Sequence, residues 1–286
     1  MQFWAIQTLN SLALGGMLFL LSSGFSLVFG LLRIPNLAHG ALFMLGAYVG
    51  ATLLQNGVEF WMAVLGSGVA VGLFGALLER VMLRRLAGND QGQVLATLGV
   101  AFIIADLCLV TWGGDPIPLA APALFRRPLF LAGLAFPTYR LVVLGLSVVV
   151  FAAFYLLMER TRIGAMIRAG VDDRDMARAI GIPVSRLFTA VFFLGALLAG
   201  AGGVVGGPML SAYPGLDGDM LPLALVVVIL GGIGSLVGAM VGSLIVGLIY
   251  NFGTALFPDF AYVILFLPMV LALVFKPQGL FGRALR

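Results

Sequence analysis

The sequence predicts an all-α polytopic membrane protein in which about eight spans, some of them broken or re-entrant, form one domain over residues 1–286. The chain is 62% hydrophobic and 10% charged, whereas an average soluble domain is about 25% charged. Several charge-free runs reach the ~20 residues that a helix needs to cross a bilayer. Glycine, with 39 residues, is about twice as frequent as its usual 7%, which is typical of membrane helices that pack closely.

The first half of the chain contains four predicted spans, of which the first three are charge-free and the fourth contains Asp106. They are residues 9–29, 37–54, 60–78 and 94–112. Arg33, Pro35 and Asn36 interrupt the apolar sequence between the first two spans. The N-terminus has no basic segment before its apolar run, so we interpret the first span as retained rather than as a cleaved signal peptide.

The second half contains predicted spans at residues 141–158, 187–205 and 260–275. Residues 113–138, which hold five of the thirteen prolines, and residues 206–219 are predicted to be external loops. The charge-free stretch 220–258 is too long for one crossing. We therefore expect two short limbs, 220–230 and 236–252, joined by a turn at Gly231, Gly232, Gly234 and Ser235.

The distribution of basic residues predicts the orientation. Thirteen of the sixteen Lys and Arg residues lie on the side of residues 159–186, and the other side has only Arg126, Arg127 and Arg140. Basic residues are enriched on the cytoplasmic side of membrane proteins, so residues 159–186 and the C-terminus are expected in the cytoplasm. The basic residues are at the ends of apolar runs, and they do not indicate nucleic-acid binding.

Residues 159–186 form the long polar segment of the chain, and they carry the start and stop signals of a helix at 172–180. Asp172 or Asp173 can cap this helix, and Asp175 in its first turn is favourable at the positive end of the helix dipole. Gly181 can end it in the left-handed conformation. Its apolar face would consist of Met176, Ala177, Ala179 and Ile180. The alternative is a solvated linker.

Two absences exclude classes of site. A phosphate-binding loop needs a Lys after a glycine-rich turn, but the single lysine, Lys276, precedes Pro277. If the protein uses ATP, another subunit must bind it with Mg²⁺. Cys108 is the single cysteine, so the chain has no internal disulfide and no cysteine-based metal site. We expect no cofactor and no metal on this chain.

Three polar residues in or near the spans are candidates for a translocation pathway. His39 is the single histidine, and Asn36 lies three residues before it, which places both on one face of a helix. Asp106 lies inside a predicted span, where an ionisable group is a functional candidate by default. It could pair with His39 or with a partner subunit. The alternative is structural, in which each residue makes one hydrogen bond to a neighbouring helix.

The glycines of the predicted turn and its second limb have two interpretations. Gly234, Gly238 and Gly242 recur every four residues on one helix face, which favours close helix packing. Gly231, Gly232, Gly234 and Ser235 could instead line a pathway, because irregular backbone at membrane depth occurs where it meets protein or water.

Five long motifs resemble those of the bacterial branched-chain amino acid ABC permeases, in their LivH-type rather than LivM-type form. The motifs are GFSLVFGLLRIPNLAHGALFMLGAYVGA, ERVMLRRL, ERTRIGAMIRAGVDDRDMARAIGI, VVVILGGIGSLVGAMVGSLIVGL and KPQGLFGR. They cover nearly the whole chain, and Pro35 is a departure from many relatives. The resemblance implies a type II importer-like permease in the bacterial inner membrane. It implies as partners a LivM-type permease, two cytoplasmic ATPase subunits and a periplasmic binding protein.

The resemblance also implies that residues 159–186 contain the helix that couples the permease to its ATPase. The residues expected there are Gly164, Arg168, Asp172, Asp173, Asp175, Met176, Ala177, Ile180 and Gly181. Permeases for urea and short-chain amides look similar. Two other classes stay open from the residues alone: an intramembrane serine protease that pairs His39 with Ser22, Ser23 or Ser26, and an ion-coupled carrier.

Overall fold

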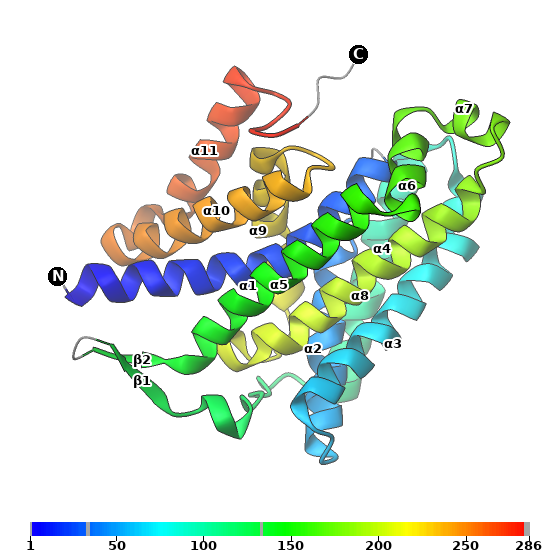
Figure 1. The fold of residues 1–286 in the computed structure, drawn as a ribbon. Helices are drawn as coiled ribbons and strands as arrows, with labels where there is room; N and C mark the ends of the chain where they lie inside the picture. Colours follow the sequence, from blue (N-terminus) through cyan, green and yellow to red (C-terminus); the bar gives the residue numbers. More distant parts are fainter. Residues whose placement is uncertain (1, 33–34, 132–133, 283–286) are drawn as a thin grey trace.

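The computed structural model describes residues 2–32, 35–131 and 134–282, and most of them are helical (Figure 1). The first half contains α1 (Gln2–Leu32), α2 (His39–Gln55), α3 (Phe60–Val81), η1 (Leu83–Leu86), α4 (Asp90–Trp112) and η2 (Ala123–Phe125). A hairpin follows, with β1 (Pro128–Leu131) and β2 (Leu134–Pro137). The second half contains α5 (Thr138–Arg160), α6 (Arg162–Asp172), α7 (Arg174–Ala179), α8 (Val184–Leu210), α9 (Leu216–Gly231), α10 (Leu236–Leu256), η3 (Pro258–Phe260) and α11 (Ala261–Phe275).

Six of the described helices are long and apolar enough to cross a membrane, namely α1, α3, α4, α5, α8 and α10. The helices α2, α9 and α11 are apolar but shorter. The prediction of about eight spans with some short or broken ones is confirmed in outline. The β1–β2 hairpin lies at one end of the bundle, called here the hairpin end, and α6 and α7 lie at the other, the α6–α7 end (Figure 1).

The core of the bundle is built around α2, whose residues are mostly buried and which packs against α3, α4, α8 and α9, while α8 also packs against α1. Glycines allow the close approach of these helices. A Cβ atom on Gly46 of α2 would lie 2.4 Å from Cα of Gly200 in α8, and one on Gly24 of α1 would lie 2.5 Å from the Gly195 carbonyl oxygen. Small residues at helix contacts let backbones approach and gain dispersion energy that lipid cannot supply.

The helix α2 begins at buried residues inside the bundle, and α9 begins beside it. His39, the first residue of α2, donates from Nε2 to the carbonyl oxygen of Leu21 at 3.0 Å. Leu21 is eleven residues before the end of α1, or about 16 Å along the helix. The first turn of α9 lies beside it, since a Cβ on Gly40 would be 2.6 Å from the Asp217 carbonyl oxygen. Two helix N-termini therefore meet at depth in the bundle.

Both predicted external loops need correction. Residues 206–219 are mostly helical, because α8 continues to Leu210 with Pro208 inside it and α9 begins at Leu216. Residues 113–138 contain the antiparallel hairpin, in which Pro128 pairs with Pro137. A proline begins β1 and another ends β2, and proline is unfavourable inside a sheet, so the sequence did not indicate these strands. An isolated bridge between Ile117 and Ala212 joins the two regions.

Candidate functional site

The segment predicted to couple the protein to an ATPase is a helix pair that protrudes between α5 and α8 (Figure 1). The sequence predicted one helix at residues 172–180, capped by Asp172 or Asp173. The structure instead breaks the segment at Asp173, so that α6 ends at Asp172 and α7 is only six residues long. The helix α6 was not predicted because charged residues lie among its apolar ones. Its apolar side packs in the cluster that contains Ile167.

The joint between α5 and α6 depends on two of the predicted coupling residues. The Gly164 amide donates to Oγ1 of Thr161 at 3.1 Å, which caps α6. A Cβ at Gly164 would lie 2.1 Å from the carbonyl oxygen of Met158, so a larger residue cannot fit without movement. Arg168 donates to the same Met158 carbonyl and lies 3.7 Å from Glu159. Both residues therefore tie α6 to the end of α5.

The start and stop of α7 agree with the predicted signals. Asp173 is the capping residue, because its Oδ1 accepts from the Met176 amide at 2.9 Å. Gly181 adopts φ +87° after the helix, and the Ile182 amide donates to the Ala177 carbonyl at 3.0 Å. This is the left-handed termination that glycine favours. The side chains of Asp172 and Asp175 lie outside the described part of the structure.

The predicted apolar face of the coupling helix is wrong in one respect, because its members point in different directions. Ala177 is 2% exposed and belongs to a cluster inside this chain, with Ile167 and Val184. Met176 is 61% exposed and Ile180 is 67% exposed. Ala177 therefore anchors α7 to the permease itself, and Met176 and Ile180 are the apolar side chains free to meet another protein.

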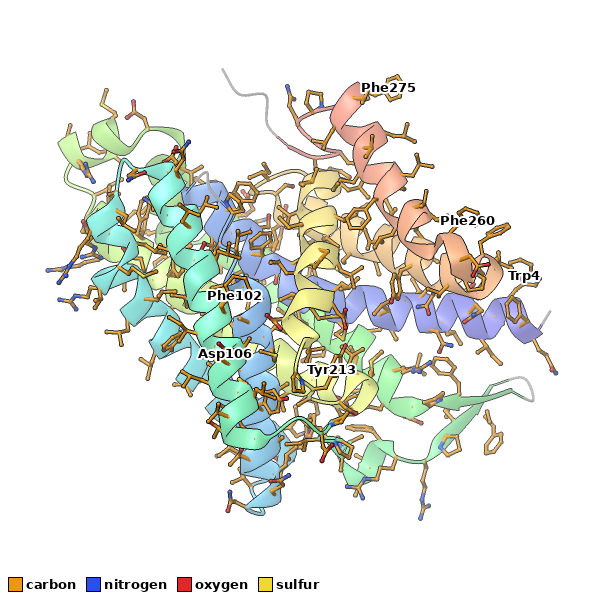
Figure 2. The ribbon with its side chains drawn as sticks, turned by 180° about the vertical axis from the view of Figure 1, so that it is seen from behind. Trp4, Phe102, Asp106, Tyr213, Phe260 and Phe275 are labelled. Carbon is orange, nitrogen blue, oxygen red and sulfur yellow. The ribbon has the colours of Figure 1, made fainter. Side chains whose placement is uncertain are left out.

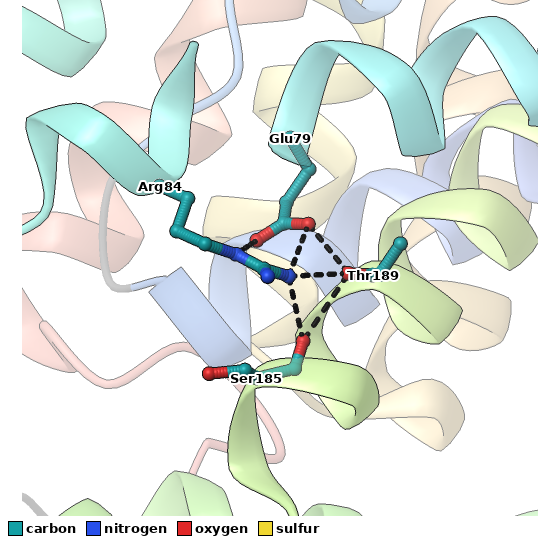
Figure 3. A network of polar contacts seen from close by, with 4 residues as sticks. All are labelled: Glu79, Arg84, Ser185 and Thr189. Carbon is teal, nitrogen blue, oxygen red and sulfur yellow. Dashed lines mark hydrogen bonds and ion pairs between the residues drawn. The ribbon is translucent and has the colours of Figure 1, made fainter. Parts of the chain in front are cut away.

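A buried carboxylate at the same end of the bundle escaped the sequence analysis (Figure 3). Glu79 near the end of α3 is 3% exposed and forms an ion pair with Arg84 of η1 at 3.1 Å. Thr189 of α8 donates to Glu79 Oε2 at 2.6 Å, and Arg84 donates to the Ser185 carbonyl at 3.0 Å. This clamp ties α3 to the start of α8, the helix that follows α7. The Glu79-to-Arg84 spacing of five gave no helical-pair signal.

The structure buries Asn36 and His39 inside the chain, at the N-terminus of α2. Asn36 is 2% exposed, and its Oδ1 accepts from the Ala38 amide at 3.2 Å. The His39 ring lies 5.2 Å from that of Phe25. Asn36 Nδ2 and His39 Nδ1 have no hydrogen-bond partner among the described residues. Neither side chain faces lipid, and the N-terminus of α2 directs the positive end of its dipole toward this buried polar position.

The geometry does not assemble a protease site around His39. The hydroxyls of Ser22 and Ser26 are buried with no hydrogen-bond partner in the part of the chain that the structure describes. The Ser23 hydroxyl donates to the Leu20 carbonyl. A serine nucleophile requires a base within hydrogen-bond reach, and the hydrogen bond recorded for the His39 ring goes to a backbone carbonyl.

Asp106 and His39 are not brought together. Asp106 is exposed on the outward face of α4, near Phe102 (Figure 2), whereas His39 is fully buried against α1. No hydrogen bond or ion pair joins the two among the described residues. The predicted Asp106–His39 pair is therefore absent from this structure, and the described residues provide no hydrogen bond from a neighbouring helix either. Of the alternatives, a partner subunit remains for Asp106.

The predicted turn at residues 231–235 is present, and its residues serve tight packing. Gly232 and Gly234 have φ values of +107° and +75°, which glycine adopts at little cost. A Cβ on Gly231 would lie 2.2 Å from the Gly238 carbonyl oxygen, so α9 and α10 touch backbone to backbone. Ser235 caps α10 by accepting from the Gly238 amide at 3.0 Å. These contacts favour the packing interpretation of the glycines.

Comparison with known proteins identifies the class to which this arrangement belongs. Residues 7–273 match the family model described as branched-chain amino acid transport system / permease component. The chain therefore belongs to this family, and it is a multi-pass ABC transporter permease. Its fold resembles a chain of PsaBC from Streptococcus pneumoniae, solved in complex with Fab, with a TM-score of 0.51 and 14% identity over 95% of this chain and 92% of that chain.

Two branched-chain amino acid permeases are similar along almost the whole chain, and a sugar permease along part of it. The high-affinity branched-chain amino acid transport system permease protein BraD of Pseudomonas aeruginosa is 28% identical over 97% of this chain and 95% of its own length. The corresponding protein LivH of Escherichia coli is also 28% identical, with the same coverage. The ribose import permease protein RbsC of Escherichia coli is 27% identical over 76% of this chain and 68% of its own length.

Proposed function

We propose that this chain is the membrane permease subunit of a high-affinity ABC importer that carries branched-chain or similar amino acids into the cytoplasm. The observation that carries the proposal is the similarity to branched-chain amino acid permeases over 97% of the chain. The match to the ribose permease covers less of both chains. The proposal follows the substrate class of the relatives that this sequence matches from end to end.

The importer would contain a second, LivM-type permease, two cytoplasmic ATPase subunits and a periplasmic substrate-binding protein. The α6–α7 end would face the cytoplasm with the C-terminus, because it carries most of the basic residues. Met176 and Ile180 would enter a groove on the ATPase. Gly164 and Arg168 would pass movement of that groove to α5, and the Glu79–Arg84 clamp would hold α8 against α3.

The buried polar residues Asn36 and His39 would lie next to the substrate pathway, inside the bundle. They are at the start of a helix that begins at membrane depth, with a polar atom of each unpartnered among the described residues. Discontinuous helices commonly border substrate sites in transporters, because their free ends supply dipoles. We expect a protein with His39→Ala to assemble with its partners but to transport more slowly.

ATP and Mg²⁺ would be used by the partner subunits only. The missing phosphate-binding lysine motivates this proposal. The purified chain alone is expected to show no nucleotide turnover above that of a mock preparation. Turnover that persisted after removal of trace ATPase, and that followed this chain through purification, would contradict it.

The transport proposal is tested by reconstituting the complete importer in lipid vesicles with ATP on the ATPase side. Uptake of radiolabelled leucine, isoleucine or valine should require both ATP and the binding protein. Unlabelled urea and acetamide serve as competitors, because urea and amide permeases are the alternative substrate class. Uptake of urea or acetamide in place of leucine would overturn the amino-acid assignment while leaving the permease class intact.

A further inference from the structure

One helix carries a charged residue on the outside of the bundle at a depth where lipid would be its surroundings. Asp106 is sixteen residues after the start of α4 at Asp90 and six before its end at Trp112. At 1.5 Å per residue it lies about 24 Å from one end of the helix and about 9 Å from the other. Trp112 donates from Nε1 to Thr52 of α2 at 2.7 Å, so α4 ends level with the end of α2.

Among the described residues, none forms a hydrogen bond or an ion pair with Asp106. Its neighbours on the same side of α4 are the exposed apolar side chains of Phe102, Ile103, Leu107 and Val110. Ionisable groups in membrane spans face the interior of a bundle, a water-filled cavity or a partner. Since Asp106 faces outward, a second protein on this face would supply such surroundings.

A glycine on the same face would permit a close approach. Gly99 lies two helical turns before Asp106, so both are on one stripe of α4. A Cβ atom at Gly99 would meet nothing within 4 Å. Glycine inside a helix costs stability relative to alanine, and here the free space serves no contact within the chain. Small residues at this position permit a neighbouring helix to approach closely.

From these observations we infer that the outer face of α4, defined here by Gly99, Phe102, Asp106 and Val110, is the docking surface for the second permease of the importer. The partner helix packs on Gly99 and presents a hydrogen-bond donor to Asp106. A distinct partner fits better than a second copy, because a copy that packed the same α4 stripe against itself would bring two Asp106 carboxylates together. The inference rests on the proposed function, which supplies the second permease.

The helix α5 provides matched controls in the same chain. Gly145 of α5 is also exposed, and a Cβ there would also meet nothing within 4 Å. Val149 of α5 is 63% exposed, the same fraction as Phe102. No charged residue lies on this part of α5. A substitution at Gly99 or Gly145 therefore adds the same bulk without a clash inside the chain, and only Gly99 lies on the inferred docking surface.

The first experiment maps the contact in the complete importer. Benzoylphenylalanine replaces Phe102 in one variant and Val149 in the other, and both are irradiated in the membrane. The inferred surface gives a crosslink from position 102 to the second permease and none from position 149. A crosslink from position 149 alone, or from position 102 to lipid or to another copy of this chain, overturns the inference.

The second experiment measures assembly by co-purification of the second permease with a tagged chain. Gly99→Leu should reduce the recovered partner by about tenfold or more, and Gly145→Leu should not change it. Asp106→Leu should reduce it by about tenfold, the order expected for one interhelical hydrogen bond, and Asp106→Asn should recover part of the loss. Equal effects of Gly99→Leu and Gly145→Leu overturn the inference. A wild-type complex with no second permease overturns the proposed function instead.

Discussion

Replacement of Met176 and Ile180 by serine should weaken binding of the ATPase without unfolding the permease. Full burial of a large apolar side chain contributes about 1.5–3 kcal/mol. These two side chains are 61% and 67% exposed, so a protein groove could still gain about 1–2 kcal/mol from each. The double variant should lose about 2–4 kcal/mol of binding free energy, equivalent to about 30-fold to several hundred-fold in Kd.

The assay is a titration of detergent-solubilised permease complex with labelled ATPase, followed by the ATP-dependent uptake measurement. Val81→Ser is the matched control, because Val81 is an exposed apolar residue at the same end of the bundle. Ala177→Glu should behave differently from both, since Ala177 is buried within this chain and an unpaired charge there destabilises the permease itself. Wild-type ATPase affinity and wild-type uptake in the double variant would refute the coupling role of α7.

Three further predictions test the joints and the orientation. Gly164→Ala should lower the free energy of unfolding by about 1–3 kcal/mol through overpacking, whereas Gly170→Ala in the same helix, where the nearest atom is 3.5 Å away, should change the melting temperature little. Arg84→Ala should lower the free energy of unfolding by about 2–4 kcal/mol, because it leaves the buried Glu79 carboxylate unpaired. Adding Glu79→Gln should recover part of that loss, and strictly additive effects of the two substitutions would contradict the clamp. A cysteine replacing Phe130, in a variant without the native cysteine, should react with an impermeant thiol reagent from outside the cell, and labelling from the cytoplasmic side alone would reverse the orientation.

Local signals in the sequence were sufficient for most helices and turns. Apolar runs with few or no charges identified the spans, because a charged side chain within the bilayer is costly. Gly181 was identified as a helix end, and Gly231–Ser235 as a turn, because the requirement for positive φ or a cap depends on the backbone at that residue alone. Asp173 was one of two capping candidates for the same reason, and the structure selected it.

Tertiary contacts decided which side of each helix meets the protein. Helical periodicity places Met176, Ala177 and Ile180 near one another, but only the packing of α7 on Ile167 and Val184 separates the buried alanine from its exposed neighbours. The Glu79–Arg84–Thr189 clamp joins residues up to 110 positions apart, and no local pattern predicts such a pairing.

The sequence by itself therefore determined that this is a helical membrane protein with one long polar segment, since composition and the lengths of apolar runs depend on the solvent around the chain, and the resemblance of its motifs indicated the permease class. It did not determine the depth at which α2 and α9 begin, or that His39 faces inward and Asp106 outward. In a membrane both the lipid-facing and the protein-facing sides of a helix are apolar. The hydrophobic pattern that orients a helix in a soluble protein is then lost, and close packing between helices sets which side of each helix faces the protein.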